Sequence, residues 1–194
     1  MRILGTVSGT LNKEQQMRIT GGRYRSRKVQ CPPGVIRPAM DRMRESMFSI
    51  LGDISGLAFL DLFTGSGVVG IEAASRGAEP VMLVEMDRRK APVIRRNIDF
   101  VESSISLRLM PAERFLKKPD RMYDIIYLDP PFNYSTKKEL VEMVSRADVL
   151  FPGGLCLIHH PSNEEWPETI ENLQCSDIRV YGGSTLRFFT FPLS

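Results

Sequence analysis

The sequence predicts an α/β fold in which a seven-stranded sheet, parallel except for its last strand, is covered by helices on both faces, as in Rossmann-like domains. The main observation is a regular alternation of short apolar runs with longer amphipathic segments. A second observation is the motif FLDLFTGSGVVGIE at residues 59–72, which joins a strand, a glycine turn and a helix start. With 194 residues, 42% of them hydrophobic, the chain is long enough to bury one such core.

Four units of strand and helix follow one another along the chain. The predicted pairs are 57–63 with 67–76, 81–85 with 88–101, 105–110 with 112–117, and 123–128 with 136–147. Three further strands are expected at 154–160, 178–181 and 186–191, with Gly182-Gly183 as a hairpin turn. Asp87 is expected to cap the helix 88–101, although Pro92 lies just past its first turn.

A further helix is predicted to begin at Arg37-Pro38, after the breaker Pro32-Pro33-Gly34. Its apolar side chains recur at three- and four-residue spacing and are Met40, Met43, Met47, Phe48 and Leu51. A methionine stripe at helical spacing is more often core than a recognition surface, so we expect this face to pack on the sheet. The opposite side carries Arg42 and Glu45.

Positive charge is concentrated near the N-terminus. Between Met17 and Arg44 the chain has eight basic residues and one acid, a net charge of +7, whereas the whole chain carries only +3. Arg23, Arg25 and Arg27 alternate as along one face of a strand, which predicts a basic hairpin or extended arm. Such segregation is typical of a protein that binds a polyanion. A solvated edge that merely discourages strand pairing is the alternative.

Residues 1–16 carry no period and few apolar side chains, so we expect a disordered or non-native extension, with Met17 as a better start. They lack the apolar core of a signal peptide, and no stretch reaches transmembrane length, so we expect a cytoplasmic protein without membrane contact. The three cysteines are too widely spaced for a disulfide framework or a zinc site. The expected domains are the extension 1–16, the basic hairpin 17–37 and the α/β domain 38–194.

Residues 59–72 predict a site for a nucleoside-type cofactor. Gly65, Gly67 and Gly70 permit positive φ and close backbone approach, so free N–H groups at the helix start can meet a ligand. Twenty positions after Gly65, the next predicted strand ends in Glu85, whose carboxylate can accept both hydroxyls of a ribose. A glycine turn that only tightens a strand-helix corner is the alternative.

Asp61 indicates which nucleoside cofactor is bound. Dinucleotide-binding turns have an apolar residue before the first glycine and bind a pyrophosphate, which is an anion. Here Asp61 is expected at the strand end, four residues before Gly65, where a carboxylate repels a pyrophosphate and suits a cation. The zwitterionic methionine part of S-adenosylmethionine is such a ligand.

The predicted strand 123–128 runs into Asp129-Pro130-Pro131-Phe132. The two prolines remove two backbone donors, so carbonyls and the Asp129 carboxylate point out of the sheet at its carboxyl edge. An exocyclic amine on a base needs such acceptors as its nitrogen becomes pyramidal, and Phe132 can stack on the ring. An ordinary strand-ending turn is the alternative, but its coincidence with the cofactor motif favours a catalytic role.

The segments RITGGRYRSRK, IRPAMDRMRESMF, FLDLFTGSG and DPPF, together with Glu85, resemble the bacterial 16S ribosomal RNA guanine-N2 methyltransferases of the RsmD type. The resemblance extends from about Met17 to the end of the chain. It implies a class I S-adenosylmethionine-dependent methyltransferase fold and a guanine N2 amine in small-subunit RNA as the target. Family members often have threonine where this chain has Ala39, so a polar contact at that position is not carried over.

The resemblance also implies roles for individual residues. The cofactor would be bound by Asp61, Phe63, Gly65, Ser66, Gly67, Glu85, Met86, Ala112, Glu113 and Asp129. The target amine would be held by Asp129, Pro130, Pro131 and Phe132. The RNA would be contacted by Arg18, Arg23, Tyr24, Arg25, Arg27, Lys28, Arg37 and Arg42.

Two other functions remain open. A DNA adenine-N6 methyltransferase would share the Asp-Pro-Pro-Phe turn, but the chain leaves little room for a separate target-recognition segment. A non-enzymatic RNA-binding assembly factor would explain the basic hairpin but not the cofactor motif. For the predicted methyltransferase we expect a monomer that acts on the assembled or assembling small subunit. His159 and His160 are expected to be structural or pocket-lining, and no metal site is indicated.

Overall fold

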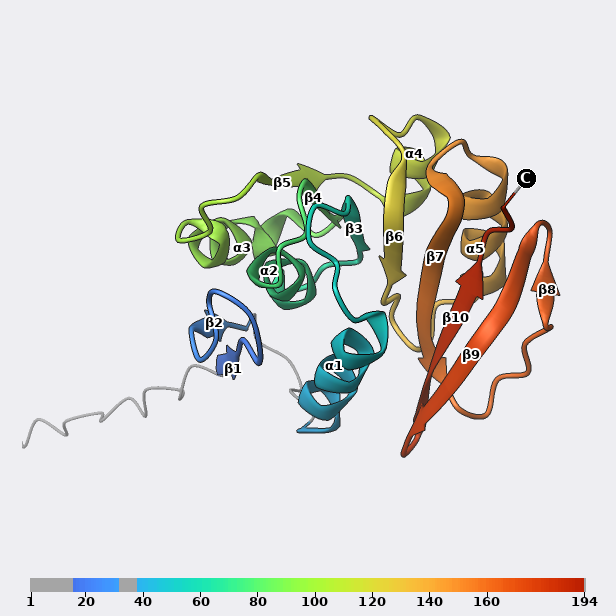
Figure 1. Ribbon diagram of the computed structural model, residues 1–194, viewed down its shortest axis with the longest axis horizontal. Coiled ribbons are helices and arrows are strands. Elements are labelled where there is room, and N and C mark those ends of the chain that lie inside the picture. The colour runs from blue at the N-terminus through green and yellow to red at the C-terminus, as the bar shows by residue number, and fades with distance from the viewer. Residues whose placement is uncertain (1–15, 32–37, 194) are drawn as a thin grey trace, which may run out of the picture.

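The computed structural model describes residues 16–31 and 38–193, and an eight-stranded sheet forms its centre (Figure 1). The strand order is β5-β4-β3-β6-β7-β10-β9-β8. The strands from β5 to β7 pair in parallel, and the pairs beyond β7 are antiparallel. The bounds are β3 Phe59–Leu62, β4 Val81–Glu85, β5 Ile105–Leu109, β6 Tyr123–Leu128, β7 Leu150–Pro161, β8 Thr169–Ile170, β9 Leu173–Tyr181 and β10 Ser184–Thr190.

All seven predicted strands are present, but the sheet contains one strand more than the seven predicted. The additional strand is β8, which has only two residues and pairs with Leu173 and Gln174 at the start of β9. Two residues are too few to show an alternation of buried and exposed side chains, so no sequence signal marked this strand. The last strand, β10, runs against both of its neighbours, as predicted.

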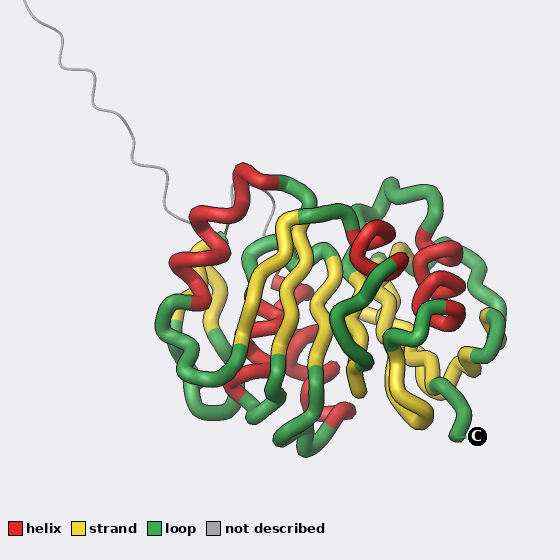
Figure 2. Tube along the Cα trace, turned by 90° about the horizontal axis from the view of Figure 1, so that it is seen from above, coloured by secondary structure: helices red, strands yellow, loops and turns green. Residues whose placement is uncertain are grey.

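Helices cover both faces of the sheet (Figure 2). Three helices share one buried cluster, and they are α1 Pro38–Leu51, α2 Val68–Ser75 and α3 Ala91–Ile98. The cluster on the other face contains α4 Ala112–Lys117 and α5 Lys137–Arg146. Successive strand residues alternate between the two clusters, so that Phe59 belongs to the first and Leu60 to the second. Within the described residues, no helix is both long and apolar enough to cross a membrane.

The predicted helix 88–101 consists of two elements. A 3-10 turn at Arg88–Lys90, η1, leads directly into α3. Pro92 lies in the first turn of α3, where a backbone N–H would have no intrahelical acceptor. Asp87 caps the preceding turn as predicted, because its side chain accepts from the backbone N–H of Arg89 at 3.0 Å.

The N-terminal segment forms a hairpin of β1 Gln16–Arg18 and β2 Lys28–Gln30. The predicted strand-like alternation of arginines is wrong, because Arg23, Arg25 and Arg27 lie in the connecting loop 19–27. We call residues 19–27 the basic loop. Its three arginine side chains are exposed although the loop is not a strand. Gln16, placed in the extension by the sequence, is the first residue of β1, and the rest of the extension lies outside the described residues.

The hairpin is packed into the first core cluster. Met17, Ile19, Tyr24 and Val29 are all buried there. The basic loop also lies close against α2, since the N–H of Arg23 donates to the Ser75 carbonyl at 2.7 Å. A Cβ at Gly22, whose φ is +74°, would come within 1.9 Å of that same carbonyl oxygen.

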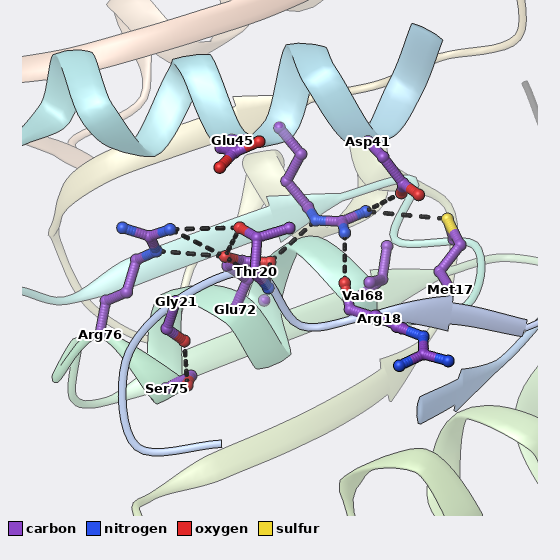
Figure 3. Close-up of polar contacts among 12 residues, drawn as sticks. Met17, Arg18, Thr20, Gly21, Asp41, Glu45, Val68, Glu72, Ser75 and Arg76 are labelled. Atoms are coloured by element: carbon purple, nitrogen blue, oxygen red, sulfur yellow. Dashed lines mark hydrogen bonds and ion pairs between the residues drawn. The ribbon is translucent and has the colours of Figure 1, made fainter. Parts of the chain in front are cut away.

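A buried ion pair joins α1 and α2 to the hairpin (Figure 3). Arg44 Nε donates to Glu72 Oε2 at 2.9 Å, with the two side chains 2% and 0% exposed. Arg44 Nη2 also donates to the Arg18 carbonyl at 2.6 Å. The backbone N–H of Thr20 reaches both Glu72 oxygens at 3.1 Å, and Arg76 Nη2 donates to Oε1 at 3.0 Å. Arg44, counted among the basic residues of the N-terminal segment, is therefore a structural residue.

These contacts keep Glu72 charged inside the protein. Burial alone would raise the pKa of Glu72, but the hydrogen bonds from Thr20 and the charge of Arg44 outweigh it and hold the pKa below its usual range. The carboxylate therefore stays ionised, and each of its oxygens has several donors. The hairpin is consequently held by charge-assisted hydrogen bonds as well as by apolar contacts.

We expect Arg44→Met to destabilise the protein by about 3–5 kcal/mol, because the change leaves the Glu72 carboxylate buried without its main counter-charge. Chemical denaturation followed by circular dichroism would measure the loss. The control is Arg146→Met, which removes an arginine that is 63% exposed and paired with Glu142 and Glu171. This variant should lose little stability. Equal losses in the two variants would contradict the structural role of Arg44.

Candidate active site

The turn between β3 and α2 has the backbone that the glycine motif predicts. Gly65 has φ +61° and Gly67, which caps α2, has φ +83°, so both need the freedom of glycine. Gly70 differs from the prediction, because it lies within α2 without a positive φ. Its role is close packing, since a Cβ there would lie 2.2 Å from Leu83 Cδ2 on β4.

Asp61 is the last residue but one of β3 and lies at the carboxyl end of the strand, as predicted, but its side chain is buried under the glycine turn. It is 1% exposed, and its Oδ2 accepts from the Thr64 hydroxyl at 2.5 Å and from the Gly70 N–H at 3.0 Å. Its Oδ1 is buried and has no hydrogen-bond partner among the described residues. Burial raises the pKa of Asp61 to about 7. Asp61 therefore stabilises the glycine turn through these two hydrogen bonds, and its contact with a cofactor stays a prediction.

Glu85 ends β4 at the rim of the same turn. Its Oε2 accepts from the Gly65 N–H and from Lys90 Nζ, both at 3.1 Å, and its Oε1 accepts from the Asp87 N–H at 2.9 Å. The side chain is thus held by three hydrogen bonds from the protein, and Oε1 keeps a lone pair for a hydroxyl donor. Met86, the next residue, is 62% exposed.

The Asp-Pro-Pro-Phe turn follows β6 at the same edge of the sheet. Asp129 keeps its side chain 23% exposed, and its Oδ1 lies 2.8 Å from Nδ1 of His159 on β7. The ring of Phe132 meets the His159 ring edge-on, with the centroids 5.3 Å apart. The turn therefore places a carboxylate and an aromatic ring together, while the Pro131 carbonyl accepts from the Tyr134 N–H at 2.8 Å.

A cavity of about 920 Å³ connects the glycine turn between β3 and α2, which we call the cofactor turn, with the Asp-Pro-Pro-Phe turn. The predicted site residues that line it are Phe63, Gly65, Glu85, Met86, Asp129, Pro130, Pro131 and Phe132. The other predicted cofactor residues are not among the described residues that line it, and they are Asp61, Ser66, Gly67, Ala112 and Glu113. Ser66 is buried and offers its carbonyl to Asn97 Nδ2 at 2.8 Å, and Ala112 is buried where α4 begins.

The cavity has a third wall that the sequence analysis missed. Met43 of α1 lines it, as do Tyr181 at the end of β9 and the turn 182–184. The Tyr181 hydroxyl donates to Ser46 Oγ at 2.6 Å, which ties the tip of the β9-β10 hairpin to α1. Met43 was predicted as core, and it is buried as well as cavity-lining. The sequence predicted the elements of this wall, including the Gly182-Gly183 turn, but gave no signal that they line the site.

The residues predicted to contact RNA are only partly on the surface. Arg18, Arg23, Arg25, Arg27, Lys28 and Arg42 are exposed. Arg23 pairs with Glu102, and the Arg27 guanidinium lies 4.8 Å from the centre of the Phe100 ring. Tyr24, however, is 6% exposed and stacks edge-on with Phe100 in the core, so its ring is not presented to a base. Arg37 lies outside the described residues.

S-adenosylmethionine fits these residues. A Cβ built at Gly65 would meet no atom nearer than 3.9 Å, so the turn leaves room for a ligand at its backbone. Glu85 offers an acceptor for ribose hydroxyls beside it, and the apolar side chains of Phe63 and Met86 line the adjacent wall. The cavity volume suits a nucleoside cofactor together with part of a second substrate.

The fold, with a cavity that joins the glycine turn to the Asp-Pro-Pro-Phe turn, is that of a class I S-adenosylmethionine-dependent methyltransferase. Comparison with known proteins gives the family. The model of the family described as conserved hypothetical protein 95 matches residues 17–190, and the chain belongs to that family. The RsmD-type resemblance predicted from the sequence is thereby confirmed.

Individual relatives agree with this assignment. The chain is 36% identical over 179 residues to ribosomal RNA small subunit methyltransferase D of Escherichia coli K12, covering 90% of this chain and 89% of that protein. It is 30% identical over 156 residues to the protein of the same name in Haemophilus influenzae, covering 77% and 81%. The solved structure of yhhF from Escherichia coli matches with a TM-score of 0.84 and 29% identity, over 93% of this chain and 100% of that one.

We expect Glu85→Ala to weaken S-adenosylmethionine binding about 10- to 100-fold, because a charged acceptor for the ribose is lost. Glu85→Gln retains one acceptor oxygen and should lose less. Isothermal titration calorimetry would measure both. Glu168→Ala is the control, since Glu168 is exposed and precedes β8 at the far end of the sheet. Unchanged affinity in both Glu85 variants would exclude Glu85 from the cofactor site.

Proposed function

We propose that this chain transfers a methyl group from S-adenosylmethionine to the exocyclic N2 amine of a guanine in 16S ribosomal RNA. The observation that carries the proposal is the single cavity, with Gly65 and Glu85 on one side and Asp129 to Phe132 on the other. The names of the relatives in Escherichia coli and Haemophilus influenzae support the small-subunit RNA as the substrate.

The turn after β6 suits an amine because it has acceptors and few donors. Pro130 and Pro131 have no backbone N–H, so the groups available there are carbonyls and the Asp129 carboxylate. Asp129 and the Pro130 carbonyl can each accept one N–H of the amine, which favours the pyramidal nitrogen whose lone pair can attack. A ring stacked on Phe132 would keep that nitrogen directed into the cavity.

S-adenosylmethionine supplies a methyl group that is already activated for transfer. The contribution of the protein is therefore mainly orientation, which can be worth up to about 7–11 kcal/mol in favourable cases. No strong base is required, because the methylated amine can lose its extra proton afterwards. Asp129, with its side chain partly exposed, or water would accept that proton.

The basic loop is the proposed RNA contact. Met43 lines the cavity and the next residue, Arg44, holds the hairpin, so the loop is anchored one helix away from the cavity. In Figure 1 the hairpin lies beside α1 and α2. Arginines on a loop bind phosphates and read little base identity, so the shape of the folded RNA must select the target. An assembled or assembling small subunit offers such a shape.

The proposal includes a monomeric enzyme, as expected from the sequence. An enzyme that modifies ribosomal subunits during or after their assembly would work in the cytoplasm.

We expect Asp129→Ala to retain cofactor affinity and to lose about 10²- to 10³-fold in kcat, as when one preorganised polar partner of the reacting group is removed. The assay is transfer of a labelled methyl group to small subunits, to free ribosomal RNA and to DNA, followed by nucleoside analysis. Asp148→Ala is the control, because Asp148 is exposed and lies outside the cavity. Preferential labelling of DNA, or no labelling of any substrate, would overturn the proposed function.

We expect the triple change of Arg23, Arg25 and Arg27 to alanine to lower RNA affinity and to flatten its salt dependence by up to about one unit per lost phosphate contact. Cofactor affinity should stay the same. The matched control replaces three exposed bases on the opposite face of the sheet, namely Arg114 and Lys117 of α4 and Lys118, which follows this helix. If both triple variants showed the same salt slope, the basic loop would not be the RNA contact.

A further inference from the structure

One histidine lies directly against the turn that accepts the amine. His159, on β7, is 4% exposed and lines the cavity. Its Nδ1 is 2.8 Å from Asp129 Oδ1, and its ring meets the Phe132 ring at 65° with the centroids 5.3 Å apart. A single imidazole therefore contacts both the carboxylate and the aromatic ring of the turn.

The surroundings of His159 define which ring nitrogen carries the proton. An ionised carboxylate can only accept a hydrogen bond, so the hydrogen in the bond to Asp129 belongs to Nδ1. Nε2 is buried and has no hydrogen-bond partner among the described residues. A hydrogen on Nε2 would be a buried donor without an acceptor among the described residues, so we assign the hydrogen to Nδ1.

We propose that His159 is a positioning residue that holds Asp129 and Phe132 in the orientation that receives the target amine. This inference rests on the proposed function. The bond to Oδ1 restricts rotation of the Asp129 carboxylate, which is the group proposed above to accept an N–H of the amine. The edge contact fixes the ring of Phe132 on which the base stacks. His159 acts through these two groups and performs no proton transfer itself.

The neighbouring histidine provides a matched control. His160 is also buried, at 1% exposure, and its ring is 4.8 Å from the Trp166 ring. Its Nδ1 lies 2.8 Å from the Pro161 carbonyl oxygen, and it is not among the residues that line the cavity. A change at His160 therefore disturbs a similar amount of packing on the same strand without touching the turn.

The kinetic test compares three variants in the labelled methyl transfer assay. His159→Phe keeps a ring and removes the donor, and we expect kcat to fall about 10- to 100-fold with an unchanged Kd for S-adenosylmethionine. His159→Asn places an amide donor near the position of Nδ1 and should recover a large part of kcat. His160→Phe should keep kcat near the original value. Near-normal kcat in His159→Phe, or equal losses in His159→Phe and His160→Phe, would overturn the inference.

A second measurement does not depend on turnover. Two-dimensional proton–nitrogen NMR of the histidine side chains in the full chain would report the His159 tautomer directly. We expect a hydrogen on Nδ1 and a shift of that signal in Asp129→Ala. A hydrogen on Nε2 alone would overturn the inference even if methyl transfer to RNA is observed. Absence of transfer with the expected tautomer would instead remove the proposed function.

Discussion

The buried ion pair between Arg44 and Glu72 fixes the cofactor turn, the cavity wall and the hairpin relative to one another. Glu72 belongs to α2, which starts at the glycine turn. Arg44 is the residue after Met43 on α1, and Met43 lines the cavity. The same two side chains bind the backbone of Arg18 and Thr20 in the hairpin. An uncompensated charge inside the protein is strongly unfavourable, so separating these three segments would cost stability. The basic loop is thereby held against α1 and α2, one helix away from the cavity.

The carboxyl edge of the sheet holds three carboxyl groups, those of Asp61, Glu85 and Asp129, and each has a different environment. Asp61 is buried under the glycine turn, and burial brings its pKa to about 7, which limits its repulsion of the other two. Glu85 is held by backbone N–H groups and by Lys90. Asp129 is held through His159. All three carboxylates at this edge are therefore held by hydrogen bonds from the protein itself, which is the preorganisation that the proposed function requires.

Much of the fold follows from local patterns. Apolar runs of strand length, amphipathic helices and the glycine turn predicted seven of the eight strands in the central sheet and the helices between them. Glu85 and Asp129 were placed correctly because the carboxyl ends of parallel strands meet at one edge of a sheet. The strand β8 was missed because two residues show no period. The arginines of the basic loop alternate in sequence, and alternation alone does not distinguish a strand from a loop.

The sequence by itself determined the fold class, the family and the two motifs that face each other across the cavity, because each of these depends on residues close together in the chain. Only the tertiary structure decided which charged and aromatic side chains are buried. Arg44 and Tyr24 are residue types common on nucleic-acid-binding surfaces, but both are buried in this protein. Tyr181 is hydrogen-bonded to Ser46, which lies 135 positions away in the chain, and this bond holds the third wall of the cavity together. His159 contacts Asp129 from a neighbouring strand. Burial and hydrogen bonding depend on such distant partners, which no local pattern specifies.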